Sequence, residues 1–252
     1  MKQILLIGIG AGDPEHITVQ AIDALNRTQV FFVHDKGLDH DDMRSCRQRI
    51  CQRYITRPGY RWVELAAPPR EHDPKAYAQG VEAWHEQRAA LYDQAIGEHL
   101  GPDEIGAFLI WGDPSLYDST VRVLEQVRAR GREVIEWQMI PGISSVQVLA
   151  ARHRVALNRI GEPVQITTGR RLAECRPDEV ENTVVMLDAH CTFERFLGQG
   201  LDIYWGAYLG TPDEILLAGP LDDVCERIKQ ARRQARGRKG WIMDVYLLRR
   251  SG

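Results

Sequence analysis

The residues whose types and spacing suggest a functional site lie in three glycine-containing turns. They are Gly8–Ile9–Gly10–Ala11–Gly12, Gly112–Asp113–Pro114–Ser115 and Pro141–Gly142–Ile143–Ser144–Ser145. Each follows an apolar stretch typical of a buried strand and precedes a helical pattern. Glycine in such a turn lets a ligand approach the backbone. In an open parallel sheet all three turns lie at the carboxyl edge, so the sequence predicts a ligand site there.

Acidic residues beside two of these turns bear on the kind of ligand. A dinucleotide fingerprint needs a glycine where this chain has Asp13. A helix start attracts anions, but Asp13 and Asp113 would repel a pyrophosphate. A carboxylate beside a glycine turn suits a cationic or hydroxyl-rich ligand, and S-adenosylmethionine is one. The residues therefore favour a methyl donor, with an NAD-dependent oxidoreductase as the alternative.

The sequence shows no evident nucleophile, because it has no G-x-S-x-G elbow and no cysteine with a compelling partner. Methyl transfer needs none, since the protein mainly positions a carbon nucleophile in line with the methyl group. Histidines and carboxylates gather between Asp39 and Arg53, His40 among them. We interpret them as a solvated loop and helix face, and we predict no metal site.

Hydrophobic periodicity indicates the elements that hold the turns. In the first part of the chain we expect five strands, at 4–8, 30–33, 62–65, 107–111 and 134–140. A long amphipathic helix is predicted from Tyr77 to Ala95. Ser115 is expected to cap the following helix, which Gly131 ends. Right-handed crossovers make a parallel sheet the natural topology.

The composition changes near residues 154–161, and strand candidates then crowd together. They lie at 164–168, 183–187, 203–209, 215–218 and 241–248, with one clear helix at 221–236. We therefore predict an α/β protein of two domains. Residues 1–157 form a domain with a parallel sheet, and residues 158–252 form an α/β domain with a mixed sheet. A cleft between two such domains is a common place for a small-molecule site.

Composition and charge exclude several classes of protein. The chain has 252 residues and a net charge of −3, which argues against general nucleic-acid binding. No apolar run approaches the roughly 20 residues of a membrane span, and the start of the sequence predicts no signal peptide. The five cysteines lack metal-ligand spacing. We expect them to be reduced thiols in a cytoplasmic protein.

Together, the turns and their order resemble the tetrapyrrole methylase family, also called corrin/porphyrin methyltransferases. The matching pieces are 8–14 with Ile17–Thr18, 111–114, 140–145, 184–187 and 208–212. They follow one another in family order and span essentially the whole chain. The resemblance implies two α/β domains, S-adenosylmethionine bound in the cleft between them, and a homodimer.

The resemblance also implies binding residues, position by position. Donor contacts fall on Gly112, Asp113, Leu116, Ser144, Ser145, Leu187, Tyr208 and Leu209. The contact assigned to Leu187 has two alternative positions, Met186 and Asp188, because the register of the match at this strand leaves all three open. The first loop, with Gly10 and Pro14, would line the substrate trough.

Within the family, three further stretches resemble the members that methylate C1 of precorrin-5 and release acetate during cobalamin biosynthesis. These stretches are Lys36–Gly37, 77–85 and 208–220. Two alternatives remain open: methylation at another position of a precorrin or related tetrapyrrole, and a protein that binds the donor or a tetrapyrrole without catalysis.

Acetate release and substrate charge suggest further residues. Attack of water on an acetyl carbonyl needs a general base or a polarising donor. His34, Asp35 and Tyr117 are candidates at strand ends or turns. A precorrin carries many carboxylates, which basic side chains would bind. We expect this role of Lys36, Arg170 and Arg171, which follow predicted strands.

Overall fold

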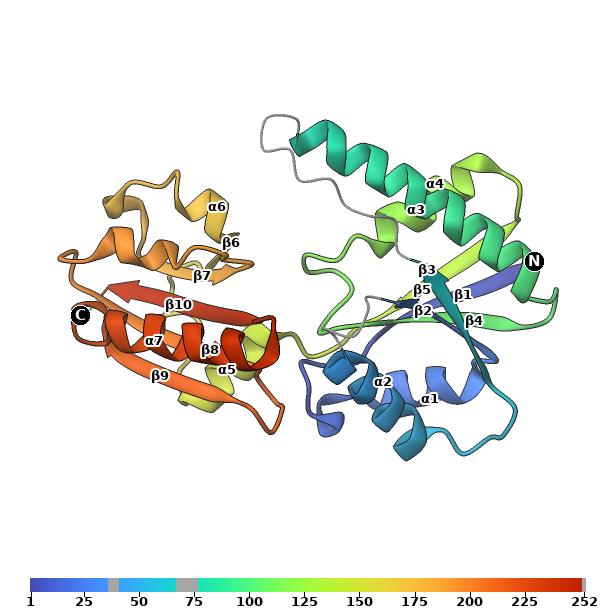
Figure 1. The fold of residues 1–252 in the computed structure, drawn as a ribbon, viewed down its shortest axis with the longest axis horizontal. Coiled ribbons are helices and arrows are strands. Elements are labelled where there is room, and N and C mark those ends of the chain that lie inside the picture. Colours follow the sequence, from blue (N-terminus) through green and yellow to red (C-terminus); the bar gives the residue numbers. More distant parts are fainter. Residues whose placement is uncertain (36–40, 67–76, 251–252) are drawn as a thin grey trace. The chain divides into compact units, whose positions relative to one another are not determined.

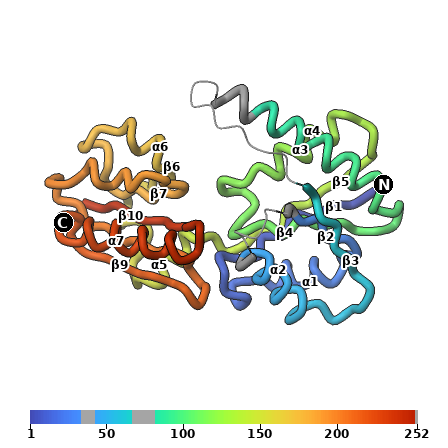
Figure 2. The backbone as a smooth tube through the Cα atoms, in the orientation of Figure 1, coloured from blue at the N-terminus to red at the C-terminus, as the bar shows by residue number. Residues whose placement is uncertain are grey.

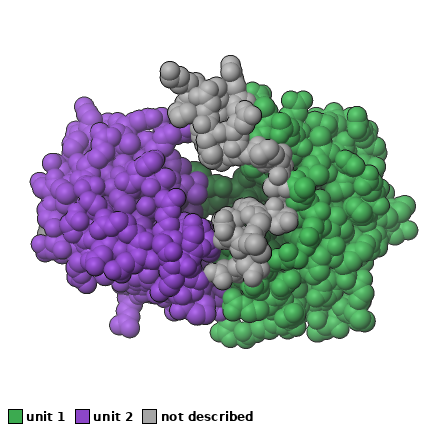
Figure 3. All heavy atoms as spheres, viewed as in Figure 1, with its two compact units in different colours: residues 1–10, 14–143 green, residues 11–13, 144–252 purple. Residues whose placement is uncertain are grey.

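The computed structural model describes residues 1–35, 41–66 and 77–250, apart from the side chains of residues 34, 35, 41, 42 and 77–81. It divides into two compact units, residues 1–10 with 14–143 and residues 11–13 with 144–252 (Figure 3). Figures 1 and 2 follow the chain through both by colour. The division places the helix at 145–153 in unit 2, whereas composition alone puts the boundary at 157; the domain limits stay a prediction.

Unit 1 is built on a five-stranded parallel sheet. Its strands are β1 (Lys2–Gly8), β2 (Val30–Asp35), β3 (Arg61–Ala66), β4 (Ile105–Ile110) and β5 (Ile135–Ile140). Their spatial order is β3-β2-β4-β1-β5, and every pairing is parallel. The predicted parallel sheet is thereby confirmed, and the ends of β1, β4 and β5 lie side by side.

Helices cover both faces of this sheet (Figure 1). They are α1 (Val19–Arg27), α2 (Asp41–Tyr54), α3 (Tyr77–His99) and α4 (Thr120–Arg130). In β1, Leu5 and Ile7 pack with α1 and α2, whereas Ile4 and Leu6 pack with α3 and α4. Because both faces are buried, β1 is a continuous apolar run rather than an alternating one.

The ends of the helices show which local signals were correct. Gly131 ends α4 in the left-handed conformation, as predicted. The predicted cap at Ser115 is wrong, because α4 begins only at Thr120. The Ser115 hydroxyl and backbone N–H instead bind the carboxylate of Asp113. Residues 113–118 therefore form a loop at the sheet edge.

Unit 2 contains a mixed five-stranded sheet, as predicted. Its strands are β6 (Gln165–Thr168), β7 (Asn182–Met186), β8 (Leu201–Ala207), β9 (Ile215–Pro220) and β10 (Asp244–Arg250). In the order β6-β7-β10-β8-β9, only β6 and β7 are parallel. β10 returns antiparallel between β7 and β8, so its first residues lie beside the last residues of both neighbours.

Helices also lie on both faces of the unit 2 sheet. They are α5 (Ser145–His153), α6 (Gly169–Leu172) and α7 (Leu221–Lys239), with 3-10 turns at 177–179 and 192–196. α7 packs on one face against Trp205 and Tyr246, and α5 packs on the other. Among the described residues, every helix is too short or too polar to cross a lipid bilayer.

Candidate active site

The glycines of the three predicted turns bring the ends of β1, β4 and β5 into direct backbone contact. A Cβ on Gly142 would lie 2.2 Å from the Gly112 carbonyl oxygen and 2.8 Å from the Gly8 Cα. Gly10 and Gly112 also exchange two backbone hydrogen bonds, of 3.3 and 2.8 Å. The glycines thus let neighbouring turns approach one another, a role that their spacing alone did not predict, and the approach of a ligand to these turns stays a prediction.

Asp113 ties two of these turns together. One carboxylate oxygen accepts a 2.8 Å hydrogen bond from Gly142 N, and the other accepts from the N–H and hydroxyl of Ser115. Partial burial acts to raise the pKa of Asp113, but these hydrogen bonds outweigh it and hold the pKa below the usual value. A fixed, ionised carboxylate therefore stands at the carboxyl edge of the sheet.

The other predicted residues of unit 1 lie on the same edge. Gly10 has φ +81° and packs against His16, and Pro14 begins the 3-10 turn at 14–16. Leu116 is half-buried in the loop after β4. Its neighbour Tyr117 is exposed and has φ +53°, which is rare for a residue with a side chain.

The predicted catalytic side chains on β2 lie outside the described residues. His34 and Asp35 are the last residues of β2, where their backbones pair with Leu65 and Ala66. Lys36 and His40 are themselves outside the described residues. The structure thus places the backbones of His34 and Asp35 at the carboxyl edge, and their roles stay proposals.

In unit 2, strand register brings a second set of predicted residues to one sheet edge. Thr168 and Val245 both pair with Met186, and Ala207 pairs with Asp244. Arg170 and Arg171 on α6, Leu187 after β7 and Tyr208 after β8 therefore share this edge. Both arginines are exposed, and Arg171 forms a 2.6 Å ion pair with Glu174.

Tyr208 and Leu209 reach this edge through their backbone rather than their side chains. Both side chains are buried, and the Tyr208 hydroxyl donates to the Trp241 carbonyl. Tyr208 has φ +49°. Residues 11–13 pack here too, because a Cβ on Gly12 would lie 2.7 Å from the Leu209 carbonyl oxygen.

The three neighbours that compete for one donor position differ sharply in exposure. Leu187 exposes 66% of its surface, Met186 is half-buried and Asp188 is only 5% exposed. Leu187 also has φ +54°. Of the two apolar side chains in this turn, Leu187 is therefore the more exposed, and its contact with the donor stays a prediction.

The two neighbouring serines of the third turn, Ser144 and Ser145, differ in burial and in their contacts. Ser144 is buried and caps α5, where its hydroxyl accepts from Val146 N at 3.2 Å and also contacts Gln147. Ser145 is half-buried in the first turn of α5. The hydroxyl of Ser144 is thus engaged in the helix cap, and the donor contacts expected of Ser144 and Ser145 stay predictions.

Comparison with known proteins gives the family. The family model of the tetrapyrrole (corrin/porphyrin) methylases matches residues 3–225. The chain belongs to this family. Tetrapyrrole methylases use S-adenosylmethionine, so this chain is an S-adenosylmethionine-dependent methyltransferase.

Individual tetrapyrrole methylases are similar over nearly the whole chain. Precorrin-6A synthase [deacetylating] of Sinorhizobium sp is 49% identical over 250 residues, covering 99% of this chain and 96% of the relative. The crystal structure of a cobalamin synthesis related protein (CobF) of Corynebacterium diphtheriae has a TM-score of 0.86 at 38% identity, covering 99% of this chain and 98% of that one.

A more distant structure shows the shared fold. Uroporphyrin-III C-methyltransferase of Thermus thermophilus, in complex with S-adenosylhomocysteine, has a TM-score of 0.61 at 17% identity. The alignment covers 98% of this chain and 97% of that one.

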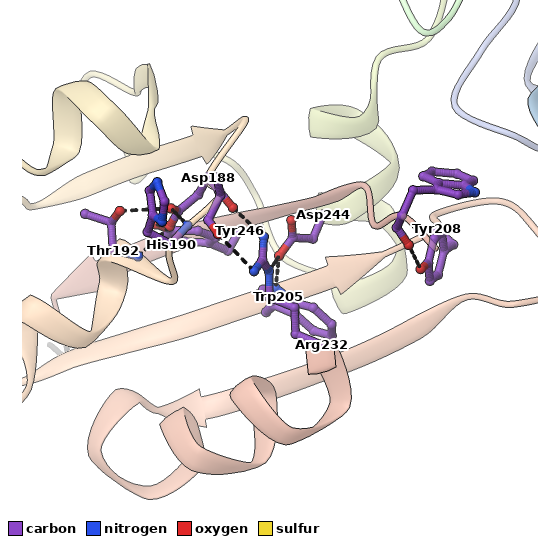
Figure 4. Close-up of polar contacts among 10 residues, drawn as sticks. Asp188, His190, Thr192, Trp205, Tyr208, Arg232, Asp244 and Tyr246 are labelled. Carbon is purple, nitrogen blue, oxygen red and sulfur yellow. Dashed lines mark hydrogen bonds and ion pairs between the residues drawn. The ribbon is translucent and has the colours of Figure 1, made fainter. Parts of the chain in front are cut away.

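Sequence reasoning missed a buried polar network in unit 2 of this methylase (Figure 4). Arg232 on α7 donates to the Asp244 carboxylate at 3.0 Å and to the Asp188 carbonyl at 2.6 Å. Trp205 Nε1 also donates to Asp244, at 2.9 Å. Burial raises the pKa of Asp244 even beside Arg232. Because α7 is rich in arginines, nothing in the sequence marks Arg232 as the one whose side chain is mostly covered.

Proposed function

We propose that this protein transfers a methyl group from S-adenosylmethionine to C1 of precorrin-5 and releases acetate, giving precorrin-6A in cobalamin biosynthesis. The 49% identity to precorrin-6A synthase [deacetylating], over 99% of this chain and 96% of the relative, carries this proposal. The structure of CobF, similar over 99% of this chain and 98% of that one, supports it.

The donor site in this proposal draws on both sheet edges. In unit 1 we assign donor contacts to Gly112, Asp113 and Leu116, and in unit 2 to Ser144, Ser145, Leu187, Tyr208 and Leu209. The residues fit S-adenosylmethionine, because the ionised Asp113 suits cationic or hydroxyl groups and the exposed Leu187 offers an apolar surface. The family resemblance is the reason for assigning all these residues to one donor molecule.

In the proposed reaction, the main task of the protein is to position the two reactants. Bound S-adenosylmethionine supplies an activated methyl group, so the residues need only align the precorrin carbon with it. Release of acetate requires water to add to the acetyl carbonyl. The carbon–carbon bond to the ring then breaks, its electron pair stays on the ring carbon, and the acetyl group leaves as acetate. A side chain must accept the proton of that water. We assign this role to His34, with Asp35 and Tyr117 as the other candidates.

Mass spectrometry of the product tests the proposal. The purified protein is incubated with precorrin-5 and S-adenosylmethionine, and we expect a product that has gained a methyl group and lost the acetyl group. A methylated product that keeps the acetyl group would identify a methyltransferase acting at another position. No conversion, with retained binding of S-adenosylhomocysteine, would identify a protein that binds the donor without catalysis.

We further propose that the protein is a homodimer, as the family resemblance implies. We also propose that it is cytoplasmic, because its five cysteines are free thiols, as is usual in a reducing compartment. Sedimentation equilibrium of the purified protein tests the assembly. A mass of two chains supports the dimer, and a mass of one chain at every concentration contradicts it.

A further inference from the structure

Leu187 and Tyr208 stand at one sheet edge of unit 2 in an uncommon conformation. Their φ angles are +54° and +49°, and Cys191 in the loop after Leu187 has φ +54°. The left-handed region is sterically unfavourable for residues with a Cβ, so it persists only where the surroundings enforce it. The contacts of Asp188, the residue after Leu187, show which groups enforce this conformation.

The carboxylate of Asp188 holds the loop that follows Leu187. Oδ1 accepts from His190 N at 2.9 Å and from the Thr192 hydroxyl at 2.8 Å. Oδ2 accepts from Thr192 N at 2.6 Å and from the Tyr246 hydroxyl at 2.7 Å. With four hydrogen bonds its acceptor positions are filled, so this carboxylate acts on the chain itself and not on a ligand.

Two further contacts fix Asp188 from outside its own loop. Arg232 donates to the carbonyls of Asp188 and Ala189, at 2.6 and 3.2 Å. Gly169 at the start of α6 packs on Asp188 so closely that a Cβ there would lie 2.6 Å from Oδ1. Figure 4 shows Asp188 between Tyr246, Thr192 and Arg232. The peptide beside Leu187 is thereby anchored to α6, α7 and β10.

We propose that Asp188 is a positioning residue of the donor site: its buried carboxylate fixes residues 187–192 so that Leu187 is presented, in its left-handed conformation, to S-adenosylmethionine. This inference rests on the proposed function, which assigns a donor contact to Leu187. Asp188 acts only through that residue and touches neither reactant.

A double-mutant cycle on donor affinity tests this role. S-adenosylhomocysteine is titrated by calorimetry into the wild-type protein and into Leu187→Gly, Asp188→Asn and the double variant. Each single variant is expected to bind about tenfold more weakly, since a buried charged hydrogen-bonding group or an apolar contact is lost. The double variant should bind no more weakly than Leu187→Gly, because Asp188 acts through Leu187.

Two more variants separate positioning from stability. Tyr246→Phe keeps the ring packed against Phe193 and removes only the hydrogen bond to Asp188. It should weaken binding less than Asp188→Asn does, and it decides the question if Asp188→Asn fails to fold. The matched control is Asn182→Ala, at the other end of β7, where a buried amide binds Leu157, Pro163 and Arg249. It should lower Tm and leave donor affinity unchanged.

The outcomes are distinct. Additive losses in the cycle, or variants at 188 and 246 that lower Tm with unchanged affinity, would overturn the positioning role while leaving the proposed function intact. A wild-type protein that binds no S-adenosylhomocysteine would overturn both.

Discussion

Asp113 and Asp188 are acidic residues beside turns, and both direct their carboxylates to the chain's own hydrogen-bond donors. Asp113 joins the turns after β4 and β5, and Asp188 holds the loop after β7. The difference lies in solvent access. Asp113 is half-buried with three acceptor contacts, whereas Asp188 is buried with four. Only Asp113 therefore keeps capacity for a ligand.

Replacing Asp113 by alanine tests its place in the donor site. The variant should stay folded and bind S-adenosylmethionine about tenfold or more weakly, because a charged hydrogen-bonding group is worth about 1.5–3 kcal/mol. Ser115→Ala is the control, since it keeps the carboxylate and the contact with Gly142 and should change affinity little. Calorimetric affinities equal to wild type in both variants would remove Asp113 from the site.

His153 on α5 is expected to make the free energy of unfolding depend on pH. Its Nε2 lies 3.0 Å from the Trp205 carbonyl, and burial lowers its pKa below the usual value. As pH falls below about 6.5 the unfolded chain binds a proton that the folded chain binds less readily. Stability should therefore be lost toward acid pH, by at most about 1.4 kcal/mol per pH unit.

His153→Gln should remove this component, because glutamine can donate to the same carbonyl without titrating. Urea unfolding of both proteins at about pH 7.5 and pH 5.5, on either side of the usual histidine pKa, measures it. The free energy of unfolding should fall less with acidification in the variant. Equal falls in the two proteins would show that His153 does not contribute.

At the scale of elements, the strands and some helix ends could be predicted because they depend on local pattern. Apolar runs marked β1 and β4, a largely apolar stretch with Glu136 and Gln138 marked β5, and Gly131 marked the end of α4. The cap at Ser115 was wrong because Asp113, two residues earlier, takes the Ser115 hydroxyl. The contact among Gly8, Gly112 and Gly142 could not be predicted, since it joins segments far apart in the sequence and depends on the sheet order.

Gly142→Ala tests whether these three turns need glycine to meet. The new Cβ would collide with the Gly112 carbonyl and the Gly8 backbone, neither of which can rotate away. The free energy of unfolding should fall by about 1–3 kcal/mol, as in other overpacked sites. Gly237→Ala in α7 is the control: it meets open space and should stabilise by about 0.5–1 kcal/mol. If urea unfolding gives Gly142→Ala the same free energy of unfolding as wild type, the contact among the three turns is contradicted.

The charge of the whole molecule constrains how it holds a precorrin. A net charge of −3 gives no long-range attraction for a substrate rich in carboxylates, so the attraction must be local. Arg170 and Arg171 stand exposed at the same sheet edge as Leu187. The ion pair of Arg171 with Glu174 is a surface pair that a substrate carboxylate can replace at little cost.

Replacing both arginines by alanine should raise the KM for the precorrin several-fold and leave the KM for S-adenosylmethionine unchanged. The salt dependence of the precorrin KM should also weaken, since two screened attractions are lost. Arg176→Ala, an exposed arginine paired with Asp178, serves as the control. If the double variant and the control give the same kinetics as wild type, the substrate carboxylates bind elsewhere.

The stoichiometry of acetate release tests the central claim most directly. Precorrin-5 and S-adenosylmethionine are supplied to the purified protein, and acetate and S-adenosylhomocysteine are measured in the same samples over time. The proposed reaction predicts that the two products rise together in equal amounts and that neither forms without precorrin-5. S-adenosylhomocysteine that accumulates without acetate would show methylation without deacetylation and would contradict the proposed function.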